Sequence, residues 1–343
     1  MKIAILDDYQ DCVRDLDCFK LLDGHAVKVF TNSSRGVGQL AIRLASYDAL
    51  VLIRERTSLS RALLAKLPNL KLISQTGKVA GHIDVAAATE LGIAIAEGIG
   101  SPTAPAELTW ALLMAAQRKI VPYANNLKDG LWQTASTEQP LNTLGTVLKG
   151  KTLAIWGYGK IGQLIAGYGR AFGMTVLVWG SQASRDAALA AGDQAAASRA
   201  DFFERADVLT LHLRLNEATR ALVTAADLAR MKPTALFVNT SRAELVADGA
   251  LEAALSQGRP GGAALDVFNA EPLTPDAPLL RMPNVLATPH LGYVEKDSYE
   301  LYFRYAFENI AEFAKGQCTR LLNPDYKFAS RHTSSAPASP DAS

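Results

Sequence analysis

Three short segments in the second half of the chain each carry a side chain suited to acid–base or anion-binding chemistry. The segments are FVNTSRAEL, LDVFNAEPL and ATPHLGY, which contain Arg242, Glu271 and His290. Each follows an apolar run that predicts a buried strand, and open α/β sheets bind ligands at the carboxyl ends of their strands. An arginine can grip a carboxylate, a histidine can exchange a proton near neutral pH, and a glutamate can keep that histidine charged. Together the three types suit the reduction of a 2-oxo acid by hydride.

Each of these residues also has a structural explanation. Arg242 could pair with an acid at a helix start, Glu271 could be a turn residue, and His290 could be a hydrogen-bonded loop histidine. Three of the other histidines are expected to be structural or solvent-exposed: His25, His82 and His332. The remaining one, His212, is expected near the cofactor.

The segment TLAIWGYGKIGQ places three glycines, Gly157, Gly159 and Gly162, in the pattern G-x-G-x-x-G. The pattern directly follows a predicted buried strand, opens a predicted helix and is followed by a second strand, TVLVW. In that context the glycines permit a tight turn, the approach of a pyrophosphate to the backbone, and close helix–strand packing. The segment therefore predicts a dinucleotide-binding site.

Short apolar runs alternate with segments of helical period along the chain, which is typical of parallel sheets covered on both faces. The segment at 101–120 predicts a helix that joins two domains, and 295–315 predicts a last amphipathic helix. The expected strands form two series: KIAIL, HAVKVF, DALVLI, LKLIS and GIAIA, then TLAIW, TVLVW, DVLTLHL, ALFVNT, GAALDVF and NVLATP.

Composition is that of an ordinary globular enzyme. The chain has 343 residues, is 49% hydrophobic and 20% charged, and carries a net charge of +1. This balance argues against nucleic acid or a membrane surface as a partner, and no run approaches the length of a membrane span. The start of the chain does not resemble a signal peptide, so a cytoplasmic location is expected. The cysteines lack metal-ligand spacing, so no metal site is expected.

The sequence resembles the D-isomer-specific 2-hydroxyacid dehydrogenase family over nearly its whole length up to about residue 325. The matching stretches are ISQTGKVAGHIDVAAATELGIAI, PAELTWALLMAAQR, LKGKTLAIWGYGKIGQ, VNTSRAELVADGALEAALSQGRPGGAALDVFNAEPL and NVLATPHLGY.

The resemblance implies an α/β fold of two doubly wound parallel-sheet domains, one flavodoxin-like and one Rossmann, with a cleft between them. The discontinuous substrate domain would comprise residues 1–100 and 294–325. Residues 101–293 would bind NAD(P) and form a homodimer interface, and residues 326–343 are expected to be a disordered tail.

The resemblance also implies the roles of the site residues. His290 matches the family's acid–base histidine, Glu271 the glutamate that orients it and favours its charged form, and Arg242 the arginine that binds substrate. The family holds the substrate carboxylate on backbone N–H groups of a loop, which here comprises Thr76, Gly77, Lys78 and Val79.

The identity of the substrate stays open at this stage. Arg54, expected near the substrate loop, and Lys78, within it, could hold a second anionic group, such as the phosphate of 3-phosphoglycerate. Glyoxylate or hydroxypyruvate would need no such group. A co-repressor-like protein that binds the dinucleotide as a sensor is an alternative with the same fold.

Most NAD-dependent relatives carry an acid where this chain has Gly180, which removes the repulsion of a 2′-phosphate. Ser181, Gln182, Ser184 and Arg185 then follow with donors suited to a phosphate. NADP is therefore favoured, with NAD as the other possibility. The residues expected at the cofactor are Gly157, Tyr158, Gly159, Lys160, Ile161, Gly162, Gly180, Ser181, Gln182, Arg185, His212, Thr240, Ser241 and Asp266.

Overall fold

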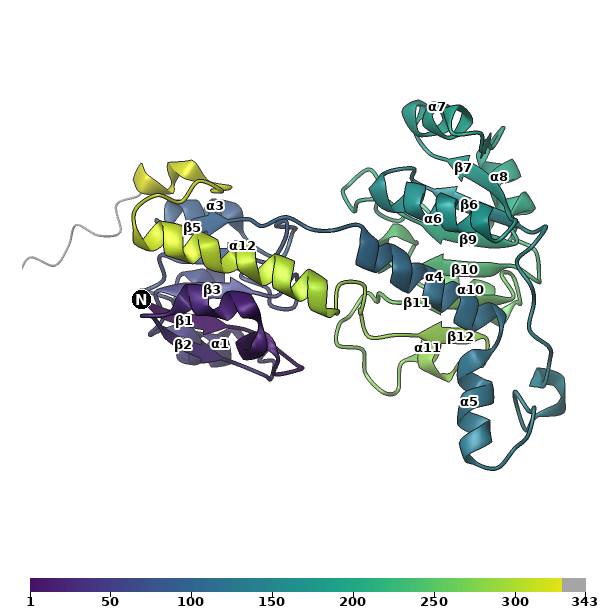
Figure 1. Ribbon diagram of the computed structural model, residues 1–343, viewed down its shortest axis with the longest axis horizontal. Helices are drawn as coiled ribbons and strands as arrows, with labels where there is room; N and C mark the ends of the chain where they lie inside the picture. The colour runs from purple at the N-terminus through teal and green to yellow at the C-terminus, as the bar shows by residue number, and fades with distance from the viewer. Residues whose placement is uncertain (329–343) are drawn as a thin grey trace, which may run out of the picture. The chain divides into compact units, whose positions relative to one another are not determined.

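The computed structural model describes residues 1–328, which divide into two compact units (Figure 1). The first unit contains Met1–Ser101 and the chain from Glu295 onward, and the second contains Pro102–Val294. Each unit is built around one parallel sheet, so the α/β fold class expected from the sequence is confirmed.

The first unit has a five-stranded sheet in the order β2-β1-β3-β4-β5. Helices α1, α2 and α3 pack against one face through a core of aliphatic side chains. The long helix α12 lies against the other face, where the Ser74 hydroxyl of β4 donates to the Ala306 carbonyl at 2.8 Å. The bounds are β1 Lys2–Ile5, β2 Ala26–Val29, β3 Ala49–Leu52, β4 Leu72–Gln75, β5 Ala94–Ala96, α1 Val37–Leu44, α2 Arg61–Leu64, α3 Val85–Glu90 and α12 Lys296–Ala314.

The second unit has a seven-stranded sheet in the order β12-β11-β10-β9-β6-β7-β8. Helices α4 and α6 cover one face, and α8 and α10 cover the other, where Phe202 and Phe203 are fully buried. The strands are β6 Thr152–Trp156, β7 Thr175–Trp179, β8 Gln194–Ala195, β9 Val208–Leu211, β10 Leu236–Asn239, β11 Gly262–Leu265 and β12 Val285–Ala287. The helices are α4 Thr103–Gln117, α5 Ile120–Lys128, α6 Lys160–Ala171, α7 Gln182–Ala190, α8 Arg199–Arg205, α9 Ala225–Leu228, α10 Ala250–Ser256 and α11 Pro278–Arg281.

Every apolar run singled out in the sequence forms a strand, and the last amphipathic segment forms α12. Two elements were not expected. The two-residue strand β8 is too short to show an alternating pattern. The segment at 101–120 does not continue as one helix, because Lys119 adopts a φ of 52° and a second helix, α5, begins at Ile120.

A disordered tail is expected from residue 326 onward, but residues 326–328 are ordered. Residues 324–328 form a 3-10 helix, η5, in which the ring of Tyr326 contacts that of Phe313. Just before it, the buried Asn323 accepts a hydrogen bond from the Ile95 backbone N–H at 2.7 Å, which fastens the segment to β5. The rest of the expected tail, 329–343, and His332 lie outside the described residues.

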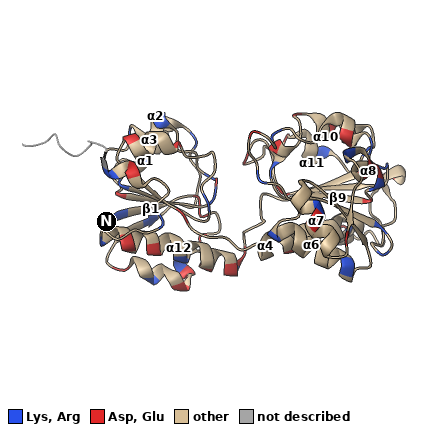
Figure 2. Cartoon of the chain, turned by 90° about the horizontal axis from the view of Figure 1, so that it is seen from above, with Lys and Arg blue, Asp and Glu red and all other residues tan. Residues whose placement is uncertain are grey.

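Basic and acidic residues are interspersed along each unit (Figure 2). Among the described residues, no helix is long and apolar enough to cross a membrane.

Candidate active site

The G-x-G-x-x-G turn lies between β6 and α6, where the order of strands in the sheet changes direction. Gly157 has a φ of 102°, and a Cβ there would overlap the His212 carbonyl. A Cβ on Gly162 would overlap the Gly157 carbonyl, whereas nothing lies within 4 Å of a Cβ on Gly159. The turn thus requires glycine at two positions for its own packing and leaves an open face at the third. An open face beside a helix N-terminus fits the phosphates of a dinucleotide.

The side chain of Tyr158 does not contribute to that open face. Its hydroxyl donates to Asp193 at 2.5 Å, and Asp193 also accepts from Arg170 at 2.7 Å. Burial raises the pKa of the Tyr158 hydroxyl, which therefore stays protonated. Tyr158 anchors the turn with its side chain, while Lys160 and Ile161 form the first turn of α6.

His212 follows β9, and its carbonyl packs against the glycine turn. Its Nε2 lies 3.0 Å from the Thr210 hydroxyl, and burial lowers the pKa of the ring to about 4. The imidazole is therefore neutral at physiological pH and brings no positive charge to the turn.

The end of β7 leads directly into α7. Gly180 has a φ of 148°, where a side chain would be strained, and Ser181 caps α7 by accepting from the Ser184 N–H. The guanidinium of Arg185 lies 4.9 Å from the centre of the Trp179 ring and donates to Gln182 at 2.8 Å. These residues form a polar surface at the end of β7, with Arg185 as its cation.

Arg242, Glu271 and His290 follow β10, β11 and β12, which are neighbours in the sheet. His290 Nδ1 lies 2.7 Å from Glu271 Oε2, and Glu271 Oε1 accepts from the Phe268 backbone N–H at 2.9 Å. The glutamate is thus fixed by the backbone and fixes the imidazole in turn. Its contact with Nδ1 leaves Nε2 as the ring nitrogen for proton transfer.

Asp266, expected at the cofactor, holds the loop that carries His290. Its buried carboxylate accepts from the Thr288 hydroxyl and the Leu291 N–H, both at 2.7 Å, and from the Gly292 N–H at 2.9 Å. Burial raises the pKa of Asp266, against the effect of these donors. Three bonds to one carboxylate hold the loop while His290 adopts a φ of 55°. No motif in the sequence indicates this contact between Asp266 and the loop.

The turn before Arg242 is shaped by Asn239, a buried residue at the end of β10. Its side chain accepts from the Ser241 N–H at 3.0 Å and donates to the Arg242 carbonyl at 2.9 Å. The Arg242 guanidinium donates to the Ser241 carbonyl at 2.6 Å. The Thr240 hydroxyl lies 2.7 Å from that of Thr109 on α4.

In the first unit, the loop expected to hold the substrate carboxylate follows β4. Gly77 has a φ of 82°, and a Cβ there would overlap the guanidinium of Arg54. The Arg54 N–H donates to the Thr76 hydroxyl at 2.9 Å, and its guanidinium donates to the Thr76 carbonyl at 3.3 Å. The structure therefore brings Arg54 directly against the loop.

Lys78 and Val79 of the same loop already have an anionic partner. The carboxylate of Glu97 accepts from the Val79 N–H at 2.7 Å and from Lys78 Nζ at 2.8 Å. Glu97 belongs to no recognised sequence motif, and its contact with the loop follows only from the pairing of β4 with β5.

No group of three or more His, Cys, Asp or Glu side chains within residues 1–328 is arranged to hold a metal ion. Cys12, Cys18 and Cys318 are free thiols. Burial raises the pKa of Cys18 to about 12 and that of Cys12 to about 11, so neither thiol is a nucleophile at neutral pH.

The second unit carries the G-x-G-x-x-G turn and the histidine–glutamate pair at one edge of a Rossmann sheet. These features define a dinucleotide-binding oxidoreductase. The sequence profile "D-isomer specific 2-hydroxyacid dehydrogenase, NAD binding domain" matches residues 110–292. The chain belongs to this family, as the resemblance implied.

Relatives agree with this assignment. The chain is 38% identical to a glyoxylate reductase of Aeropyrum pernix over 74% of this chain and 76% of that one. It is 33% identical to a D-3-phosphoglycerate dehydrogenase of Methanocaldococcus jannaschii, over 92% of this chain and 58% of the relative. The crystal structure of a phosphoglycerate oxidoreductase from Vibrio cholerae o395 is 57% identical, with a TM-score of 0.89 over 92% of this chain and 99% of that one.

The protein is accordingly an oxidoreductase that acts on the CH–OH group of a small 2-hydroxy acid, or on the matching 2-oxo acid, with a nicotinamide cofactor. The comparisons do not favour the co-repressor-like alternative.

The contacts of Asp266 lead to a prediction about the loop that carries His290. Asp266→Asn offers one acceptor oxygen where the carboxylate has two, so a backbone N–H of the loop loses its partner. We expect the free energy of unfolding, measured in urea, to fall by about 1–3 kcal/mol. The control Asp276→Asn, at an exposed position in the same unit, should change it by less than about 0.5 kcal/mol. Equal stabilities of Asp266→Asn and the parent would contradict the role of Asp266.

Proposed function

We propose that the enzyme interconverts a 2-oxo acid and its D-2-hydroxy acid, with a substrate of the phosphoglycerate, glyoxylate or hydroxypyruvate class. The observation that carries this proposal is the 2.7 Å contact between His290 Nδ1 and Glu271 Oε2. We further propose that its partners are small molecules and that it acts in the cytoplasm; its free thiols fit a reducing compartment.

His290 is the acid–base residue in this proposal. In the direction of reduction, its Nε2 donates a proton to the oxygen of the carbonyl group, and in the reverse direction it accepts one. Glu271 holds the ring through its contact with Nδ1 and so keeps Nε2 directed to the substrate. The nicotinamide cofactor supplies or accepts the hydride when bound.

Arg242 and the loop at 76–79 bind the substrate in this proposal. The planar guanidinium of Arg242 grips the carboxylate and polarises the carbonyl group. In the first unit, the N–H groups of Gly77 and Lys78 hold the carboxylate, with Arg54 as the adjacent cation. The N–H groups of Thr76 and Val79 donate to the Leu52 carbonyl and to Glu97.

Two variants test the histidine–glutamate pair. His290→Ala should lower kcat by about 10²–10⁴-fold because the proton donor is lost, whereas cofactor affinity measured by fluorescence titration should stay unchanged. Glu271→Ala removes the carboxylate that orients the ring, so kcat should also fall while cofactor affinity again stays unchanged. A near-normal kcat in either variant would remove that residue from the mechanism.

We infer that NADP is the preferred cofactor. The hydroxyls of Ser181 and Ser184 lie 3.1 Å apart at the N-terminus of α7, and Arg185 adds a positive charge one residue further on. The one nearby acid of α7, Asp186, accepts a hydrogen bond from Gln182 at 2.7 Å. Hydroxyl donors, a cation and a helix N-terminus suit a 2′-phosphate, and an acid at the strand end would repel it.

The parent enzyme should have a higher kcat/KM for NADPH than for NADH. Arg185→Ala should lower kcat/KM for NADPH by about tenfold and leave that for NADH nearly unchanged, because only the phosphate meets the charge. Ser181→Asp should act in the same direction by repulsion. Position 181 suits this test better than Gly180 because its φ of −60° accepts any side chain and aspartate also caps helices.

The matched control is Arg230→Ala, which removes an arginine that pairs with Glu204 on the same unit. It should leave the ratio of the two kcat/KM values unchanged. A parent enzyme that clearly prefers NADH would contradict the inferred preference before any variant is made.

We propose that the enzyme is a homodimer formed through the cofactor-binding unit. Large apolar side chains are exposed along α5 and the segment that follows it, among them Trp132 (75% exposed) and Leu144 (87% exposed). A groove of about 660 Å³ lies beside them, lined by residues of α4, α5, the segment 135–146 and the start of β12. Clustered apolar side chains of this size mark a protein interface.

The double variant Trp132→Ser/Leu144→Ser should shift the protein from dimer toward monomer, because it removes two large apolar contacts. The measurement is the molar mass in sedimentation equilibrium over a range of concentrations. Ile42→Ser is the control, since Ile42 is 86% exposed on α1 of the other unit. A monomeric parent, or a double variant that remains as dimeric as the control, would contradict the proposed interface.

A further inference from the structure

Glu97 is held at the carboxyl edge of the first unit's sheet, directly after β5. Strand β5 pairs with β4 in parallel, so Glu97 emerges beside the loop that follows β4. The loops also touch through their backbones: the Gly98 N–H donates to the Gly77 carbonyl at 2.8 Å, and a Cβ on Gly98 would lie 2.9 Å from the Gly77 nitrogen. The close approach leaves the two loops little freedom to separate.

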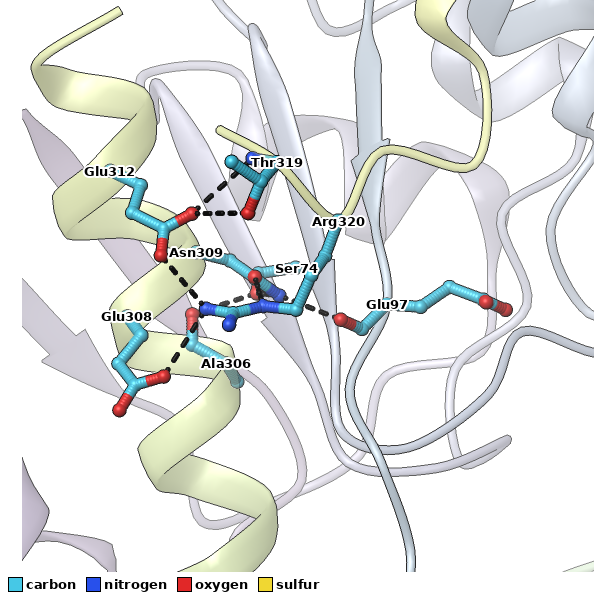
Figure 3. Close-up of polar contacts among 8 residues, drawn as sticks. All are labelled: Ser74, Glu97, Ala306, Glu308, Asn309, Glu312, Thr319 and Arg320. Carbon is cyan, nitrogen blue, oxygen red and sulfur yellow. Dashed lines mark hydrogen bonds and ion pairs between the residues drawn. The ribbon is translucent and has the colours of Figure 1, made fainter. Parts of the chain in front are cut away.

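The backbone of Glu97 is fastened on both sides, as Figure 3 shows in part. Its N–H donates to the Arg320 carbonyl at 3.0 Å, and its carbonyl accepts from Asn309 Nδ2 at 3.1 Å. Asn309 is fully buried on α12 and accepts from Arg320 Nε at 2.7 Å. In Figure 3 the Glu97 side chain extends away from Arg320. The guanidinium of Arg320 has its own carboxylates, Glu308 and Glu312, each at 3.2 Å.

The Glu97 carboxylate therefore points to the substrate loop, where it accepts from the Val79 N–H and from Lys78 Nζ. The side chain is only 16% exposed, so solvent screens its charge incompletely. The contact has two effects. One backbone donor of the loop is satisfied by the protein's own carboxylate, and the charge of Lys78 is matched by that of Glu97.

Two opposite charges therefore meet at the loop. Lys78 Nζ lies 2.8 Å from the Glu97 carboxylate, so the charge of Lys78 is matched within the protein. The single carboxylate of glyoxylate or hydroxypyruvate needs only the loop's other donors and makes no demand on Lys78. A phosphorylated substrate carries one to two further negative charges near neutral pH, and these would face the Glu97 carboxylate.

We propose that Glu97 is a specificity-determining residue that selects 2-oxo acids with a single negative charge over phosphorylated ones. This inference rests on the proposed binding of substrate by the 76–79 loop. Glu97 acts by repelling a second anionic group and by holding Lys78, which would otherwise be available to bind it. The residue sets the charge of the substrate and takes no part in hydride or proton transfer.

The test compares hydroxypyruvate with its 3-phosphate ester, two substrates that differ only in the phosphate. The parent enzyme should have the higher kcat/KM for hydroxypyruvate. Glu97→Gln keeps an oxygen that can accept from the Val79 N–H but loses the charge, so the ratio of kcat/KM for the ester to that for hydroxypyruvate should rise about tenfold. The rise should come from a lower KM for the ester, with kcat for hydroxypyruvate nearly unchanged.

Two further variants show whether the effect of Glu97→Gln comes from the charge of this residue at the loop. Glu90→Gln removes the same charge from an exposed pair with Arg61 and should leave the ratio unchanged. Lys78→Met leaves Glu97 without its counter-charge and should move the ratio in the opposite direction to Glu97→Gln. Unfolding midpoints of all variants identify any that are misfolded.

A parent enzyme that reduces neither compound nor glyoxylate would reject the proposed function itself. A parent enzyme that reduces them but prefers the phosphate ester would overturn the role of Glu97 alone. A Glu97→Gln variant that folds but leaves the ratio of the two kcat/KM values unchanged would also overturn the role of Glu97.

Discussion

The strands of both sheets run parallel, and the chemistry of the molecule depends on this arrangement. Parallel strands end at the same edge, so the loops that follow them are neighbours even when they are far apart in sequence. Arg242, Glu271 and His290 are separated by tens of residues, yet they follow three adjacent strands, β10, β11 and β12. The glycine turn follows β6 at the point where the order of strands changes direction. The same arrangement in the first unit brings Glu97 to the loop after β4.

Acidic and amide side chains then hold these loops in place by accepting hydrogen bonds from backbone N–H groups. Asp266 holds the loop of His290, Glu271 accepts from Phe268, and Glu97 accepts from Val79. A backbone N–H that is shielded from water needs an acceptor, and a carboxylate forms stronger bonds to it than a neutral group does. Each carboxylate also brings a negative charge to its loop, and that of Glu271 lies beside His290 while that of Glu97 lies beside Lys78.

Glycine contributes at these edges through the absence of a side chain. At Gly157 and Gly162 a Cβ would overlap a carbonyl oxygen, and at Gly77 it would overlap the Arg54 guanidinium. At Gly159 the same absence leaves an open surface beside a helix N-terminus. At the three crowded glycines, the missing side chain lets parts of the protein pack closely. At Gly159 it leaves room for a phosphate beside the backbone.

The sequence by itself determined every strand of the two sheets except β8, helix α12, the glycine turn and the three residues after β10, β11 and β12. These features depend on apolar periodicity and on short motifs, which are local properties of the chain. The break at Lys119 and the strand β8 left no such pattern. The tertiary structure alone decided that Glu97 bonds to Val79 and that Asp266 holds the loop of His290. Those contacts join residues that meet only after strands pair and loops pack, so no local pattern in the sequence records them.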